Sequence, residues 1–131
     1  MTTQIFVNLP VRDLEKSKAF FAALGYANNP QFTDENPACI VISDTIYVML
    51  LVEPFFQGFT RKTICDARAQ TEVILCLSAD TRAGVDALAD KALAAGGSET
   101  LEAKDYGFMY QRSFQDLDGH QWEVVHMDDA A

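Results

Sequence analysis

Hydrophobic residues along this chain follow a period of two in some stretches and a period near 3.6 in others. The alternation over residues 4–9 predicts a strand. Asp13 is then placed to cap a helix and Gly25 to end it. The core-facing positions of that helix would be Leu14, Ser17, Phe21 and Leu24. Two more strands are expected around residues 38–43 and 46–52.

The second half of the chain repeats this order. Residues 72–78 predict a strand, either Asp80 or Thr81 would cap a helix, and Gly96 would help to end it. Strands around residues 107–115 and 121–127 follow. The apolar face of the second helix recurs at i, i+3, i+4, i+7 and i+8, at Val85, Leu88, Ala89, Ala92 and Leu93.

These elements predict an α+β protein built from two βαβββ modules. Module one spans about residues 1–53 and module two about residues 71–128, with a linker at about 54–70. Two such modules can form a curved mixed sheet around a cavity, with the helices outside. A ferredoxin-like sandwich would also fit the first strand and helix, but the extra strand in each half favours the two-module plan. The whole chain of 131 residues is expected to be a single domain.

Composition narrows the classes of function. Hydrophobic residues make up 49% of the chain, which indicates a folded protein. The formal net charge is −9, and the basic residues form no cluster. Such a charge opposes binding to nucleic acids and to anionic membranes.

The three cysteines are far apart and form no Cys-x-x-Cys pair. Cys39 and Cys76 fall in apolar strand-like runs and are expected to be buried and reduced. The N-terminus has no signal-peptide pattern, and no run of residues is long and apolar enough for a membrane span. We expect a soluble cytoplasmic protein.

An acidic turn precedes the last strand. In the stretch Asp116-Leu117-Asp118-Gly119-His120-Gln121-Trp122-Glu123, the glycine can adopt the positive φ of a short hairpin, and Asp118 is expected to cap the turn. This stretch resembles the C-terminal signature of the vicinal oxygen chelate superfamily, which includes glyoxalase I, bleomycin-resistance proteins and extradiol dioxygenases. The segment Val7-Asn8-Leu9-Pro10-Val11-Arg12-Asp13-Leu14-Glu15-Lys16-Ser17, with Phe20-Phe21 and Leu24-Gly25, is similar to the first strand and helix of the superfamily.

The resemblance allows a test for a metal site. Metal enzymes of the superfamily take four ligands from equivalent strand positions, which fall here on Phe6, Met49, Ile74 and Glu123. Only the glutamate is a good ligand for a divalent ion. We therefore predict no metal cofactor, with Glu123 as the one candidate catalytic residue.

A slipped ligand set is the alternative. Glu72 would share a strand face with Ile74, while His120, His126 or Glu53 would have to turn inward. In a regular strand, however, Glu123 and His126 point to opposite faces, and only a bulge near Val124 would change this.

The predicted cavity has mostly apolar walls, with Asn8 as a hydrogen-bonding group. Phe55 and Phe56 of the linker would close over the cavity, pack on a second subunit or cover the core. Glu72 would pair with Glu123 if both point inward, and is solvated otherwise. The candidate ligand-binding residues are Phe6, Asn8, Met49, Phe55, Phe56, Glu72, Ile74, Tyr110 and Arg112.

An alternating ladder runs through residues 106–114, with Tyr110 and Arg112 at its centre. If this face is the inner one, Arg112 would pair with Glu123 or bind a ligand anion. If it is the outer one, the ladder is helix-facing core. We prefer the arrangement in which Arg112 faces Glu123. Trp122 is expected to pack against the second helix.

Two functions remain. The first is a bleomycin-resistance-like protein that binds a small, partly hydrophobic molecule without metal, as a homodimer, which the resemblance implies. The alternative is a metal-dependent lyase, epimerase or dioxygenase with Glu123 as ligand or base.

Overall fold

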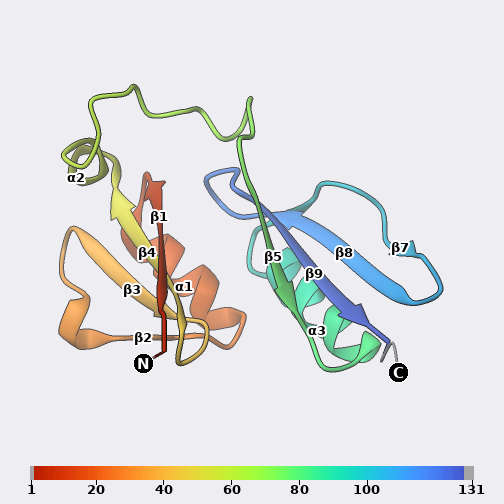
Figure 1. Ribbon diagram of the computed structural model, residues 1–131. Coiled ribbons are helices and arrows are strands. Elements are labelled where there is room, and N and C mark those ends of the chain that lie inside the picture. Colours follow the sequence, from red (N-terminus) through yellow and green to blue (C-terminus); the bar gives the residue numbers. More distant parts are fainter. Residues whose placement is uncertain (1, 129–131) are drawn as a thin grey trace. The chain divides into compact units, whose positions relative to one another are not determined.

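The computed structural model describes residues 2–128, and the chain divides into two units between Cys65 and Asp66. Figure 1 shows both units, each with a helix along one face of a small sheet. Each unit is described by itself below.

The first unit is a four-stranded mixed sheet with one long helix. Its strands lie in the order β1-β4-β3-β2, and β1 pairs in parallel with β4 while the other pairs are antiparallel. A short helix, α2, follows the last strand. The elements are β1 (Ile5–Val11), α1 (Leu14–Ala23), β2 (Ala27–Asn28), the 3₁₀ helix η1 (Pro30–Phe32), β3 (Pro37–Val41), β4 (Ile46–Val52) and α2 (Glu53–Gln57).

Helix α1 forms as the pattern predicted. The side chain of Asp13 accepts a hydrogen bond from the backbone N–H of Lys16 at 3.1 Å, and Gly25 adopts a φ of +103° beyond the last turn. The helix packs on β3 and β4. The covered sheet face is apolar and buried, and includes Leu9, Ala38, Ile40, Val48 and Leu50.

The second unit repeats this topology. Its strands lie in the order β5-β9-β8-β6, with β5 parallel to β9 and the small strand β7 added on β8. Thr81 is the helix cap, because its hydroxyl accepts a hydrogen bond from the N–H of Gly84 at 2.9 Å. The elements are β5 (Ile74–Ser78), α3 (Arg82–Ala94), β6 (Ser98–Glu99), β7 (Lys104–Asp105), β8 (Met109–Gln115) and β9 (Gln121–Met127).

The matching strand orders confirm the predicted α+β class and the repeat of βαβββ units. Two predicted strand boundaries were wrong, because β5 begins at Ile74 rather than Glu72 and β8 begins at Met109 rather than Gly107. The short helix α2 lies at the start of the expected linker. Because β5 pairs with β9 only from Gln121 onwards, Glu72 has no partner position in that ladder.

The turn between β8 and β9 is organised by Asp116, whereas the sequence indicated Asp118 as the cap. One carboxylate oxygen of Asp116 accepts hydrogen bonds from the N–H groups of Asp118 and His120, each at 3.0 Å. The other oxygen accepts from the indole N–H of Trp122 at 3.0 Å. Asp116 is the better cap because its position lets it reach both turn amides and the indole. Burial raises the pKa of its carboxyl, although His120 and these donors favour the charged form.

Gly119 is required at this turn for two reasons. It adopts a φ of +91°, and a Cβ there would lie 2.9 Å from the backbone nitrogen of Arg68. The guanidinium of Arg68 also donates a hydrogen bond to the carbonyl of Leu117 at 3.0 Å. The segment before β5 is thereby attached to the turn.

The cysteines differ in their environment. Cys39 is buried, as expected, whereas Cys76 and Cys65 are exposed. The expectation for Cys76 was wrong because its strand is covered on one face only, and Cys76 lies on the other face. In the described part of the chain, no helix has the length and apolarity that crossing a membrane would need.

We predict that Asp116→Ala lowers the free energy of unfolding by about 2 kcal/mol, because three N–H groups lose their acceptor in a buried place. Urea unfolding followed by the fluorescence of Trp122, the single tryptophan, measures this in the second unit. Asp44→Ala, in an exposed turn of the first unit, is the control and should change the value by less than about 0.5 kcal/mol. Equal stabilities for the two variants would contradict the assigned role of Asp116.

Candidate functional site

The second face of the β1-β4-β3 sheet, away from α1, carries several of the predicted site residues. Asn8 lies opposite Met49, and Phe6 lies opposite Tyr47, so all four side chains share this face. The rings of Phe6 and Tyr47 stack with centroids 4.8 Å apart and an angle of 11° between their planes. The prediction that Phe6, Asn8 and Met49 share a face is confirmed.

A pocket of about 390 Å³ lies on this face, and its lining residues all belong to the first unit. The floor comes from the strands, one rim from the η1 loop and the other rim from α2. Its lining consists of Asn8, Gln31, Phe32, Thr33, Asp34, Pro37, Met49, Leu51, Phe55 and Phe59. The cavity that the two-module plan implies stays a prediction.

The η1 rim is held by short-range hydrogen bonds. Asn29 caps η1 by accepting from the N–H of Gln31 at 3.0 Å, and Thr33 accepts from the N–H of Cys39 at 3.0 Å. The carboxylate of Asp34 accepts from the N–H of Asn36 at 2.8 Å. These bonds leave the ring of Phe32 at the surface, with 54% of it exposed. The loop is therefore a defined wall of the pocket.

The α2 rim is aromatic. Phe55 and Phe59 meet edge to face, with centroids 5.4 Å apart and an 80° angle between their planes. The side chain of Gln57 donates to the carbonyls of Thr60 and Lys62 at 3.1 and 2.8 Å, which folds the chain back after the helix. Phe59 nonetheless remains 66% exposed. Two large rings at a pocket edge leave apolar surface for a ligand to cover.

Some of the residues that were predicted for the inter-module cavity line this pocket of the first unit. Asn8, Met49 and Phe55 line it, whereas Phe6 and Phe56 do not. The main omission was the η1 loop. Its signal was present, because Phe32 is a large apolar residue within an otherwise polar turn sequence that starts at Asn28. The lining residues that the sequence did not identify are Gln31, Phe32, Thr33, Asp34, Pro37, Leu51 and Phe59.

The second face of the other sheet carries the acidic candidate. Glu123 lies between Cys76 on β5 and Ser113 on β8, and Ile74 is on the same face. One Glu123 oxygen accepts a hydrogen bond from the side chain of Gln111 at 3.0 Å. Although Cys76 is exposed by its surface area, partial desolvation of the thiol and then the nearby Glu123 carboxylate raise its pKa. Cys76 is thus held in its protonated form and is a poor nucleophile.

Arg112 lies on the opposite face, toward α3. Its guanidinium donates to the carboxylates of Asp86 at 2.9 Å and Asp90 at 3.2 Å, and the Tyr110 hydroxyl donates to Asp86 at 2.6 Å. The prediction that Arg112 faces Glu123 was therefore wrong. The reason is that residues 110, 112 and 114 share the helix side of β8, where acidic residues of α3 supply partners. Phe114 and Trp122 are buried on this same side, as expected of helix-facing core.

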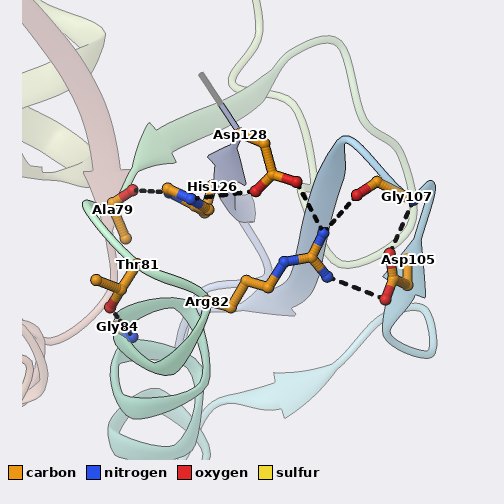
Figure 2. Close-up of polar contacts among 8 residues, drawn as sticks. All are labelled: Ala79, Thr81, Arg82, Gly84, Asp105, Gly107, His126 and Asp128. Atoms are coloured by element: carbon orange, nitrogen blue, oxygen red, sulfur yellow. Dashed lines mark hydrogen bonds and ion pairs between the residues drawn. The ribbon is translucent and has the colours of Figure 1, made fainter. Parts of the chain in front are cut away.

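His126 also lies on the helix side, among polar contacts at the end of β9 (Figure 2). Its Nδ1 donates to the carbonyl of Ala79 at 3.0 Å, and its Nε2 lies 3.5 Å from an Asp128 oxygen. The guanidinium of Arg82 lies between the Asp128 and Asp105 carboxylates. The β8–β9 register continues without a bulge from Gln121 to Met127, so Glu123 and His126 point to opposite faces, as predicted.

The donor groups do not fit a catalytic divalent ion. The four positions that the superfamily resemblance implies provide one carboxylate, in Glu123, beside two hydrocarbon side chains and a thioether. Glu72 is exposed and lies before the start of β5. Within residues 2–128, no group of three or more His, Cys, Asp and Glu side chains is placed to hold a metal ion.

Comparisons with known proteins agree with this architecture. Residues 3–43 match the family described as bleomycin resistance protein-like N-terminal. A solved hypothetical protein from S. aureus, SA1046, is 33% identical, with a TM-score of 0.81 over 96% of this chain and 95% of that one. No curated protein matches the chain.

Two further solved structures share the fold at lower identity. A glyoxalase-related enzyme from Fulvimarina pelagi is 20% identical, with a TM-score of 0.80 over 96% of this chain and 88% of that one. A bleomycin resistance determinant encoded on the transposon Tn5 is 19% identical, with a TM-score of 0.67 over 98% of this chain and 99% of that one.

The Asp86 contacts predict a pH-dependent contribution to stability. The hydrogen bonds from Tyr110 and Arg112 lower the pKa of the Asp86 carboxyl from its usual 3.8. A lowered folded-state pKa gives stability that is complete above the usual value and is lost as the pH falls through the folded-state value. Asp86→Asn should therefore lower the Tm at pH 7, and the Tm difference from the natural protein should shrink below about pH 4.

Thermal unfolding at several pH values measures this difference. Asp80→Asn, at an exposed residue of the same unit, is the control and should give only a small difference in Tm. A pH-independent Tm difference for Asp86→Asn would contradict the assignment.

We also predict that added Ni²⁺, Zn²⁺, Mn²⁺ or Fe²⁺ gives no saturable rise in Tm. A single carboxylate binds these ions weakly, whereas an ion at 100 times its Kd would stabilise the fold by about 2.7 kcal/mol. Elemental analysis of the purified, untagged protein accompanies the thermal measurement. Near-stoichiometric metal would show that a different ligand set exists.

Proposed function

The chain belongs to the vicinal oxygen chelate superfamily, and from that premise we propose that it binds a small, partly hydrophobic molecule in the pocket of the first unit, without metal and without turnover. The observation that carries the proposal is the pocket itself. It combines apolar walls with a few polar groups, which is the usual composition of a small-molecule site, and its volume of about 390 Å³ lies in the usual range.

The chemistry of the lining supports binding rather than catalysis. Of the residues that line the pocket, Asp34 is the one with an ionisable side chain. The other polar groups are the amides of Asn8 and Gln31 and the hydroxyl of Thr33, which orient a ligand through hydrogen bonds. A general acid–base pair or an activated nucleophile would need further titratable groups.

The named relatives favour the same function. One of them is a bleomycin resistance determinant, and a Streptomyces protein of the same fold, TnmS3, is described as antibiotic-binding. Their likeness to this chain is one of fold, so a sequestering role is carried over here as part of the proposal. We also propose that the chain acts as a homodimer in the cytoplasm.

The alternative is an enzyme with Glu123 as ligand or base. Gln111 occupies one oxygen of that carboxylate, and the neighbouring Cys76 is held protonated. Neither observation favours the alternative.

We predict that a neutral apolar fluorophore, N-phenyl-1-naphthylamine, binds saturably and that Phe55→Ala raises its Kd about tenfold, because a pocket ring is lost. The increase in fluorescence on titration measures Kd. Phe6→Ala is the matched control, since Phe6 lies on the same sheet face but outside the lining. Its Kd should stay within about twofold of the natural protein. Equal losses in the two variants, or no saturable binding, would overturn the proposed site.

A further inference from the structure

We infer that the pocket of the first unit selects an organic cation, an apolar or aromatic body that carries a protonated amine, and that Asp34 recognises the charge. This inference rests on the proposed function and names the class of ligand.

The lining of the pocket carries a negative charge. Asp34 contributes a carboxylate, and the described lining residues include no lysine, arginine or histidine that would neutralise it. A ligand anion would therefore meet a like charge in a partly apolar site. Asp34 is exposed, and an ammonium group would gain an ion pair with it that becomes less screened where the ligand itself covers the carboxylate.

Hydrogen bonds within the loop hold Asp34 in place. Its Oδ1 accepts from the N–H of Asn36 at 2.8 Å, and its own N–H donates to the carbonyl of Pro37 at 2.9 Å. Asn36 in turn accepts from the N–H of Val52 through its carbonyl at 3.0 Å. In the described structure, Oδ2 accepts no hydrogen bond. The carboxylate thus has one oxygen held by the loop and one available for a ligand.

The rim of the pocket is aromatic. Phe32, Phe55 and Phe59 line the same pocket, and each has a third or more of its surface exposed. Ring faces attract cations through their negative electron density. A carboxylate together with several phenyl rings therefore favours a cation with an apolar body over a neutral molecule of the same shape.

The net charge is distributed unevenly between the two halves of the sequence. Residues 1–65 contain six acidic and five basic side chains, a net charge of −1, although the whole chain has −9. The charge excess therefore lies in the second half of the sequence, whereas the pocket is in the nearly neutral first half. Within the first unit, Asp34 is the charged residue of the pocket lining, so we assign the selection to Asp34.

The experiment compares three ligands with one naphthalene body: 1-naphthylmethylammonium, 1-naphthylmethanol and 1-naphthoate. Calorimetric titration at pH 7 and 0.15 M NaCl gives each Kd, since salt at that level screens distant surface charge. We expect the cation to bind about tenfold more tightly than the alcohol, and the carboxylate to bind most weakly.

Two variants with the same change in net charge assign the effect. Asp34→Asn keeps an oxygen acceptor for the N–H of Asn36, so the loop should be preserved, and it should remove the preference for the cation over the alcohol. Asp44→Asn, an exposed residue outside the lining, should keep the preference. If Asp34→Asn fails to fold, Asp34→Ser, which can also cap the turn, replaces it.

The outcomes are separable. If the alcohol binds saturably and the cation binds no better, the charge inference is wrong and the proposed function stands. If Asp34→Asn and Asp44→Asn lose the preference equally, the assignment to Asp34 is wrong. If none of the three ligands binds, the proposed function itself fails.

Discussion

Each unit has a single long helix for a sheet of four or more strands. This ratio determines which side chains of the sheet are buried and which remain available for a site. The helix can cover only one face of the sheet, so the buried apolar residues lie on that face. They are Leu9, Val48 and Leu50 under α1, and Phe114, Trp122 and Val124 under α3. Side chains alternate along a strand, so the residues between them must lie on the other face. The candidate groups, Asn8, Met49 and Glu123, are there for this reason.

The same alternation explains what the sequence could predict. A period of two places Phe6, Asn8 and Met49 on one face without any structure, and the caps at Asp13 and Thr81 follow from local hydrogen bonds. The sequence could not decide which face of β8 meets the helix, because both faces carry large polar side chains. The acidic residues of α3 decided it by pairing with Arg112.

The pocket was harder to predict because its rims are not strands. The η1 loop and α2 are each held by side-chain contacts to nearby backbone, made by Asn29, Thr33 and Gln57. Such contacts have no periodic signal in a sequence. The positions of Phe32 and Asp34 therefore became clear only in the structure, whereas the strand residues of the floor were within reach of pattern analysis.

The parallel pairing of the first and last strands in each unit also sets an order of events during synthesis. Ile5 pairs with Ile46, so β1 has no ladder partner until about forty further residues have been made. At a synthesis rate of 5–20 residues per second this takes about 2–8 s, during which an apolar strand is unpaired. Helix α1, which forms from local contacts, is made before β3 and β4, the strands on which it packs. The ladder of the first unit can then be completed before the second unit has been translated, because β1 to β4 all lie within residues 5–52.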